Sequence, residues 1–279
     1  YEILPAVFTA LFAKVPVAHI HGGEITEGAF DEAIRHSITK MSHLHFVAAE
    51  EYKKRVIQLG EQPDRVFCVG GLGIDNIFKL NLLSRFELEE SLGIKMTKTN
   101  LLVTFHPITL GDEPSEKQMR ELFSALDELV DCLVIFTMPN ADTEGRGLMK
   151  MIEGFSKERD HVKAFTSLGQ LRYLSCIKHF DMVVGNSSSG LAEVPTFRKP
   201  TINVGSRQDG RLRATSVIDC KPVKNEIVKA LHLASSNEFQ AKLESVQNPY
   251  GNGGASEKIV ETISSVDLNS LIMKQFYDL

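Results

Sequence analysis

Hydrophobic and polar positions follow two different periods along most of the chain. Short apolar runs, such as those in 43–50 and 100–107, are typical of buried strands. Between them lie longer segments with an apolar residue every three or four positions, which indicate amphipathic helices. A regular strand–helix order of this kind is typical of a parallel sheet covered by helices. The sequence therefore predicts an α/β protein.

The strand–helix pattern occurs twice. Strands are expected within 15–24, 43–50 and 65–77, and again within 100–107, 131–140, 161–165, 180–186 and 200–205. Residues 81–98 are polar and helical and contain no strand, so we interpret them as an interdomain connection. The first series is short and predicts only the C-terminal part of a domain. The expected divisions are 1–80, 81–98, 99–250 and a final helical segment, 251–279, whose helix begins near Ala255.

Composition narrows the functional classes. The 279 residues carry a net charge of −5 without any basic tract, so nucleic acid and anionic membranes are not expected as partners. No apolar run approaches the roughly 20 residues of a membrane-spanning helix. The four cysteines are scattered, without a C-x-x-C spacing, which predicts reduced thiols and a cytoplasmic location.

The first strand runs into a segment rich in ionisable residues, "HIHGGEITEGAFDEAIRHSITK" (19–40). His19 and His21 are expected to leave the strand on one side, because strand side chains alternate. Glu24 follows two glycines that permit a ligand to approach the backbone. Asp31 and Arg35 are four residues apart on the next helix, so Arg35 is expected to orient Asp31. These groups are candidates for acid–base chemistry.

Two other interpretations of the same segment stay open. The helix, expected to begin after Thr26 as its N-cap, could be a solvated face with ordinary pairs such as Glu32 with His36. The histidine pairs in 19–21 and 43–45 could also ligate zinc. A catalytic zinc site needs a third protein ligand and a carboxylate shell, and no spacing here is diagnostic. We therefore predict no metal and no cofactor.

A second informative stretch is "VVGNSSSGLAEVP" (183–195), a buried strand followed by a serine-rich turn and a helix start. Helix N-termini present unpaired N–H groups, which suit a phosphate, and Ser187 and Ser188 add hydroxyl groups. Glu193 could accept hydrogen bonds from a ribose diol. The alternative is a plain serine N-cap.

Further polar residues follow other strands of the second series. They are His106, Asn140, Arg146, Arg207 and Arg211. Each could be an ordinary surface-loop residue. Because the carboxyl ends of parallel strands share one edge of a sheet, together they describe a site for a diphosphate and a base.

Six ordered motifs carry a family resemblance that covers nearly the whole chain: "HIHGGE…FDEAIRHSITK", "VTFHP", "MPNAD", "GNSSSGLAEVP", "NVGSRQDGR" and "NPYGNGGASEKI". Together they resemble the UDP-N-acetylglucosamine 2-epimerases, and more closely the hydrolysing branch that makes N-acetylmannosamine for sialic acid synthesis. The resemblance implies two Rossmann-like domains of the glycosyltransferase-B (GT-B) type, with the active site between them and the closing helix returning to the first domain. It also implies a UDP-sugar substrate and a homo-oligomer, either a dimer or a tetramer.

The chain departs from the family pattern at two points. The family normally has residues before the position of Tyr1, including a basic loop and a catalytic aspartate, so we expect the first domain to be truncated at its N-terminus. A chain that began at Tyr1 would be expected to bind UDP without turnover. Several members of the family also have a glutamate at the position of His21.

The reaction implied by the resemblance has two stages. A base removes the C2 proton while UDP leaves C1, giving 2-acetamidoglucal, and water then adds to C1 while C2 is protonated on the opposite face. The implied roles are acid–base work for His21, Glu24 and Asp31, support of the departing phosphate or the sugar for Arg35 and His106, and UDP-sugar binding for Asn140, Arg146, Ser187, Ser188, Glu193 and Arg207.

Other functions are compatible with the same residues. A related hydrolysing epimerase acts on UDP-2,4-diacetamido-trideoxyhexose, which differs at C4 and C6 of the sugar. A glycosyltransferase of the GT-B type would need an acceptor and would release no free epimerised sugar. A protein that lacks the catalytic aspartate could bind UDP only.

Overall fold

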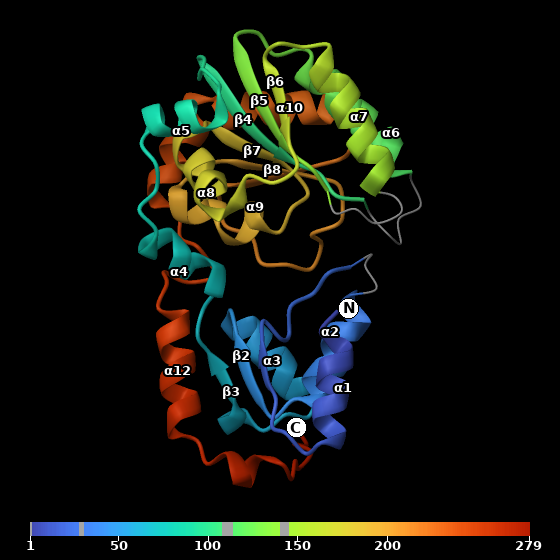
Figure 1. The fold of residues 1–279 in the computed structure, drawn as a ribbon, viewed down its shortest axis with the longest axis vertical. Helices are drawn as coiled ribbons and strands as arrows, with labels where there is room; N and C mark the ends of the chain where they lie inside the picture. The colour runs from blue at the N-terminus through green and yellow to red at the C-terminus, as the bar shows by residue number, and fades with distance from the viewer. Residues whose placement is uncertain (1, 28–30, 108–113, 140–144) are drawn as a thin grey trace. The chain divides into compact units, whose positions relative to one another are not determined.

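The structure is a computed structural model that describes residues 2–27, 31–107, 114–139 and 145–279. The chain forms two compact units, one made of Tyr1–Phe78 with Pro249–Leu279 and the other of Lys79–Asn248. Each unit contains one parallel sheet with helices around it (Figure 1). The predicted two-domain α/β fold is therefore confirmed. None of the helices in the described ranges is long and apolar enough to span a bilayer.

Unit 1, Tyr1–Phe78 with Pro249–Leu279, has a three-stranded sheet in the order β1 (Ala18–Ile20), β2 (Leu44–Val47), β3 (Val66–Cys68). Its helical elements are α1 (Leu4–Phe12), α2 (Asp31–Met41), α3 (Glu50–Gln58), η1 (Pro63–Arg65), α4 (Leu72–Lys79, whose last residue belongs to unit 2), α12 (Ala255–Ser265) and η4 (Leu268–Leu271).

The returning C-terminal segment contributes to the core of unit 1. Leu44 and Phe46 of β2 form one buried cluster with Ala255 and Ile259 of α12. Phe46 also stacks on Phe67 of β3, with ring centroids 5.6 Å apart. Burial of this apolar surface is the main force that holds α12 to the sheet.

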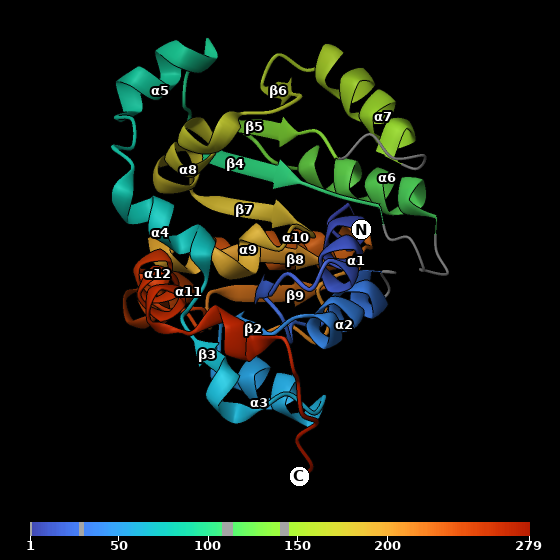
Figure 2. The same ribbon diagram turned by 60° about the horizontal axis from the view of Figure 1, so that its bottom comes forward.

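Unit 2, Lys79–Asn248, has a six-stranded parallel sheet in the order β6-β5-β4-β7-β8-β9, which Figure 2 shows. The strands are β4 (Thr99–Thr104), β5 (Cys132–Thr137), β6 (Val162–Phe165), β7 (Met182–Gly185), β8 (Thr201–Val204) and β9 (Val217–Cys220). Counted along the chain, this order is 3-2-1-4-5-6, that of the Rossmann fold. The direction of the winding reverses between β4 and β7.

The helices of unit 2 cover a continuous core. They are α5 (Arg85–Leu92), α6 (Ser115–Leu126), α7 (Gly145–Lys157), α8 (Gly169–His179), α9 (Ser189–Ala192), η2 (Val194–Phe197), α10 (Lys224–Ser235), α11 (Asn237–Lys242) and η3 (Leu243–Ser245). Val103 of β4 is aligned with Phe136 and Val184 on its two neighbouring strands, and all three side chains are fully buried. Strands buried on both faces explain the unbroken apolar runs of the sequence.

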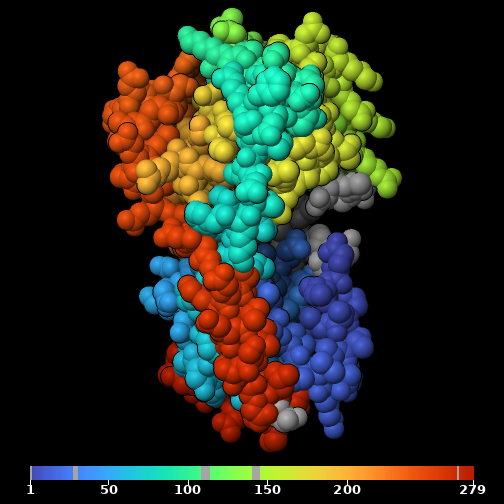
Figure 3. All heavy atoms as spheres, turned by 60° about the vertical axis from the view of Figure 1, so that its left-hand side comes forward, coloured from blue at the N-terminus to red at the C-terminus, as the bar shows by residue number. Residues whose placement is uncertain are grey.

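The segment that we interpreted as a connection, 81–98, belongs to unit 2. Helix α5 contacts α8 and lies at the surface of that unit (Figure 3). The segment before α5 is fixed by Leu83, whose N–H donates to Ser175 Oγ (3.0 Å) and whose carbonyl oxygen lies 2.8 Å from His179 Nε2.

Two local predictions were wrong. Strand β9 was not expected, and its side chains are only partly buried because it forms the edge of the sheet. Thr26 is not the N-cap of α2, since Glu27 lies in a turn. The Thr26 N–H instead donates to Glu32 Oε2 (2.6 Å). The predicted pair of Glu32 with His36 is confirmed, at 2.9 Å.

Candidate functional site

A cavity of about 540 Å³ opens at the carboxyl end of the sheet of unit 2. It lies where the winding reverses, and this is the place where open α/β sheets bind ligands. Its lining comes from residues at or just after the ends of four neighbouring strands and from the first turns of α8. The residues used in the argument below are Thr104, His106, Thr137, Tyr173, Ser187, Ser189 and Glu193.

The two strands at the reversal approach each other closely. Gly185 has a φ of +134°, and a Cβ atom at this position would lie 2.0 Å from the carbonyl oxygen of Thr104. In this chain the junction of β4 and β7 therefore requires glycine. The next N–H, that of Asn186, donates to the same carbonyl oxygen (3.1 Å). The two loops that carry His106 and Ser187 begin from this rigid junction.

Two hydroxyl groups beside the cavity are buried, Tyr173 Oη and Ser189 Oγ, and neither makes a hydrogen bond of good geometry to another described residue. Burial raises the pKa of Tyr173 to about 12, so the phenol stays protonated and can donate. The hydroxyls of Thr104 and Thr137 lie 2.6 Å apart next to them. A row of hydroxyl groups in a concave site suits the oxygen atoms of a phosphate or a sugar.

The serine-rich turn follows β7 and leads into a helix, α9, as the sequence predicted. Ser187 and Glu193 line the cavity. Ser188 is the N-cap of α9 and makes no side-chain capping bond, so the plain N-cap interpretation does not describe it. Helix α9 is a single turn of 4 residues, so its dipole is weak.

The structure describes three of the four other predicted residues of unit 2. Asn140 lies outside the described residues. Arg146 is exposed on the first turn of α7. Arg207 Nη1 donates to the carbonyl oxygen of Asn186 (3.1 Å), which ties the loop after β8 to the loop after β7. The Arg211 N–H donates to the carbonyl oxygen of Gln208 (3.3 Å) in that same loop.

In unit 1 two of the predicted acid–base candidates, His21 and Glu24, are paired across one turn. His21 Nδ1 lies 2.7 Å from Glu24 Oε1, and the Leu72 N–H donates to His21 Nε2 (3.4 Å). An imidazole whose Nε2 accepts carries its proton on Nδ1 when neutral, so His21 donates to the Glu24 carboxylate. Glu24 is only 6% exposed. A histidine paired with a buried carboxylate is a common acid–base unit.

We expected His19 and His21 to leave the strand on one side, but the structure does not show this arrangement. Strand β1 ends at Ile20, and His21 has a φ of +63°, so strand alternation does not extend to it. The His21 N–H is fixed by the carbonyl oxygen of Phe46 (2.9 Å). His19 instead lies 3.2 Å from Thr39 Oγ1. Burial, with a smaller effect of His45, lowers the pKa of His19 to about 4, so this imidazole is neutral at pH 7.

The turn after His21 is held from two helices. A Cβ atom on Gly23 would lie 2.4 Å from the carbonyl oxygen of Tyr52 in α3. Arg35 of α2 donates to the Glu24 carbonyl oxygen (3.2 Å) and to Thr26 Oγ1 (3.0 Å). Asp31 is the first residue of α2 and is half-buried. Its orientation by Arg35 stays a prediction.

Sequence reasoning missed Tyr173, Ser189 and the two threonines. Thr104 and Thr137 are the last residues of their strands, so the rule that placed His106 at the site would also have found them. Tyr173 lies one turn into α8 and does not directly follow a strand, so the same rule does not identify it.

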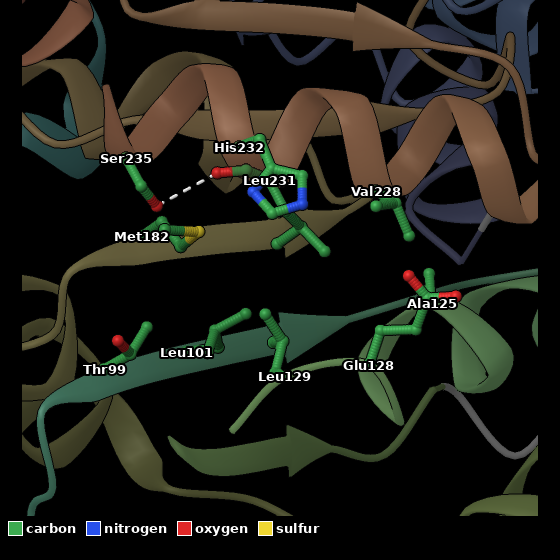
Figure 4. A pocket seen from close by; sticks show the side chains of 10 residues that line it. All are labelled: Thr99, Leu101, Ala125, Glu128, Leu129, Met182, Val228, Leu231, His232 and Ser235. Carbon is green, nitrogen blue, oxygen red and sulfur yellow. Dashed lines mark hydrogen bonds between the residues drawn. The ribbon is translucent and has the colours of Figure 1, made fainter. Parts of the chain in front are cut away.

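Within the described ranges, no group of three or more His, Cys, Asp or Glu residues is placed to hold a metal ion. All four cysteines are free thiols. A second cavity, of about 120 Å³, lies at the amino ends of β4 and β7 and is lined by Leu101, Met182 and Leu231 (Figure 4). Its apolar floor contrasts with the hydroxyl-lined cavity at the other end of the sheet.

The sequence profile of the UDP-N-acetylglucosamine 2-epimerase family matches residues 1–264. The chain is 41% identical to the GDP/UDP-N,N'-diacetylbacillosamine 2-epimerase (hydrolyzing) of Campylobacter jejuni, over all of this chain and 73% of that protein. It is also 41% identical to the polysialic acid biosynthesis protein P7 of Escherichia coli, over all of this chain and 71% of that protein.

Its fold is similar to the crystal structure of the UDP-GlcNAc 2-epimerase from Neisseria meningitidis bound to UDP-GlcNAc. The TM-score is 0.81 at 19% identity, over 94% of this chain and 73% of that one. The predicted GT-B type of fold is therefore confirmed. The chain belongs to the UDP-N-acetylglucosamine 2-epimerase family.

Proposed function

We propose that this chain is a hydrolysing 2-epimerase that converts a UDP-2-acetamido sugar to UDP and the free 2-epimer. The observation that carries the proposal is the hydroxyl-lined cavity at the sheet reversal of unit 2, in a chain matched by the epimerase family over residues 1–264. The cavity offers Ser187 and Tyr173 as hydrogen-bond donors and Glu193 as an acceptor. A nucleoside diphosphate presents the complementary groups.

In the first stage a base takes the C2 proton, the C1–O bond to UDP breaks, and a C1–C2 double bond forms. The leaving diphosphate carries the bonding electron pair, so it must be stabilised as it departs. We assign this stabilisation to His106 and to the serine-rich turn, Ser187 and Ser188. Arg207 supports the turn through its hydrogen bond to the loop after β7.

In the second stage water adds its hydroxyl group to C1, and a proton returns to C2 from the opposite face. Inversion at C2 needs proton-transfer groups on both faces of the ring. We assign them to the His21–Glu24 pair and to Asp31. Arg35, which fixes the turn of Glu24, serves as a positioning residue.

Two sugars are candidates. Our first proposal is UDP-N-acetylglucosamine, which gives N-acetylmannosamine for sialic acid precursors. The 41% identity to a diacetylbacillosamine 2-epimerase favours UDP-2,4-diacetamido-trideoxyhexose as the second candidate. We further propose a cytoplasmic homo-oligomer, a dimer or a tetramer.

The test is an NMR assay of both donors in D₂O. A hydrolysing epimerase releases UDP and a free sugar that carries solvent deuterium at C2. Glu24→Gln should reduce turnover by about 10²-fold or more. Glu238→Gln, a control at an exposed carboxylate on α11, should leave it unchanged. UDP release that depends on an added acceptor, without a free epimerised sugar, would identify a glycosyltransferase. UDP binding without release from either donor would identify a binding protein.

A further inference from the structure

We propose that Asn186 is a positioning residue that holds the main chain of His106 in place at the UDP-sugar site. The inference rests on the proposed function, because that function assigns His106 to the departing phosphate. Asn186 itself faces away from solvent, with an exposed fraction of 0%. It acts through His106 and is not a group that touches the reacting atoms.

The Asn186 side chain pairs with both backbone groups of a single residue. Its Oδ1 accepts a hydrogen bond from the His106 N–H (2.7 Å), and its Nδ2 donates to the His106 carbonyl oxygen (2.8 Å). Because β4 ends at Thr104, no strand neighbour supplies these two bonds. The amide side chain is therefore what fixes His106 beyond the end of its strand.

The backbone of Asn186 makes a further bond to the end of β4 and also binds the loop after β8. Its N–H donates to the carbonyl oxygen of Thr104. Its own carbonyl oxygen accepts from Arg207 Nη1 (3.1 Å) and from Gln208 Nε2 (2.7 Å), and Gln208 is fully buried. The loops after β4, β7 and β8 thus meet at one residue, and each of these loops carries a residue assigned to the UDP-sugar site.

An apolar residue in this place would remove the two hydrogen bonds that Asn186 makes with the N–H and carbonyl groups of His106. Buried backbone groups are rarely left unpaired, so the loop would shift towards water. A shift of the His106 backbone moves its imidazole at the edge of the cavity. Precise placement of such groups contributes strongly to rate and affinity.

Strand β4, which leads to His106, offers a control residue at its other end. Asn100 is 5% exposed, and its side chain accepts from the Thr97 N–H (2.9 Å) and donates to the Thr97 carbonyl oxygen (3.1 Å). As at Asn186, the side chain pairs with both backbone groups of one residue, although Asn100 Nδ2 also donates to Asp181 Oδ2 (3.0 Å). Thr97, however, lies at the amino end of the sheet, away from the cavity at the carboxyl end. Asn100→Ala therefore measures the loss of stability from removing a buried asparagine that lies away from the cavity.

The experiment compares Asn186→Ala with Asn100→Ala in the whole chain. Both variants should lower the urea midpoint, and Asn100→Ala at least as much, because it also loses the bond to Asp181. Calorimetry with UDP should show an affinity about tenfold or more lower for Asn186→Ala, and a change of less than about twofold for Asn100→Ala. Amide hydrogen exchange of the segment around His106 should accelerate only in Asn186→Ala.

A double variant tests whether Asn186 acts through His106. In a His106→Ala background, Asn186→Ala should weaken UDP binding by less than about twofold further, because coupled residues are not additive. If Asn186→Ala does not fold, Asn186→Asp replaces it. The carboxylate keeps the acceptor for the His106 N–H, so the affinity should fall between those of the native chain and His106→Ala.

Equal UDP affinity of Asn186→Ala and Asn100→Ala overturns the inference, and so does additive loss in the double variant. In either case the native chain still binds UDP, and the proposed function stands. A native chain that neither binds UDP nor releases it from either donor overturns the proposed function, and this inference with it.

Discussion

The carboxylate of Asp75 in α4 caps helix α12, which begins 180 residues later in the chain. It accepts hydrogen bonds from the N–H of Ala255 (3.0 Å) and from the N–H of Ser256 (2.7 Å). The N-cap position of α12 is Gly254, which has no side chain to do this. A negative charge at a helix N-terminus also interacts favourably with the helix dipole.

We expect Asp75→Ala to lower the free energy of unfolding by about 2 kcal/mol, because the cap is buried and charged. Urea denaturation at pH 7 measures this. The control is Glu87→Ala, which removes one of the two hydrogen-bonding side chains of the exposed capping box of α5. It should lower the free energy of unfolding by about half as much. Equal losses in the two variants would contradict the account.

Glu193→Ala and Ser187→Ala are each expected to weaken UDP binding by about 1–3 kcal/mol, the usual cost of a lost buried partner. Calorimetry with UDP measures the change. Ser235→Ala, at the rim of the smaller cavity at the other end of the sheet, is the control and should bind UDP normally. If both site variants bind UDP with native affinity, the serine-rich turn is not part of the UDP site.

The lowered pKa of His19 predicts loss of stability in mild acid. The folded chain holds this imidazole neutral down to about pH 4, whereas the unfolded chain takes up a proton near pH 6.5. The contribution of the neutral His19 to the free energy of unfolding is therefore complete above pH 6.5, and it is lost as the pH falls towards 4. Between pH 7 and 5 the loss is about 2 kcal/mol. His19→Gln should flatten this slope, as followed by urea denaturation at both pH values. Unchanged slopes would refute the assignment.

Glu61 predicts a second transition at lower pH. Burial alone would raise its pKa, but hydrogen bonds from His45, Lys274 and Lys40 outweigh burial and lower the pKa to about 2. Its contribution is present above about pH 4.5 and is lost as the pH falls from there to 2. We expect Glu61→Gln to cost about 3 kcal/mol at pH 7 and to flatten the curve in that acidic window only. Lys274→Met removes one of the three hydrogen-bond partners of Glu61, so it should lower the free energy of unfolding by less than Glu61→Gln does.

Chelator treatment is expected to leave turnover unchanged, since the proposed proton transfers use side chains alone. The measurement is UDP release from either donor before and after treatment with EDTA. Restoration of a lost activity by zinc would instead favour the metallohydrolase interpretation of the histidine pairs.

Strong periodic patterns made most of the fold predictable. The buried strands of unit 2, such as 132–137, read as unbroken apolar runs because both faces are covered. Strand β9 lacks this signal, because an edge strand has one neighbour and stays partly exposed. The structure locates it through its parallel pairing with β8, which runs from Thr201 with Val217 to Val204 with Cys220.

The lining of the cavity was predictable where a residue lies two positions after the end of a strand, as His106 and Ser187 do. The conformation of His21 was not, because a positive φ in a residue other than glycine is set by contacts from distant segments. Those contacts are the carbonyl oxygen of Phe46 and the N–H of Leu72. Tyr173 was missed for a similar reason, since its place beside the cavity depends on how α8 packs.

The pairing between Asn186 and His106 has a consequence for how a binding loop can be built. Two residues that exchange both of their N–H···O bonds form one rung of an antiparallel ladder. Here the side-chain amide takes the place of the second backbone. The parallel sheet thereby gains one further rung beyond its last strand pairing, at a point where the chain has already turned away. A loop of irregular shape is thus as firmly anchored as a strand, while its side chains stay available to a ligand.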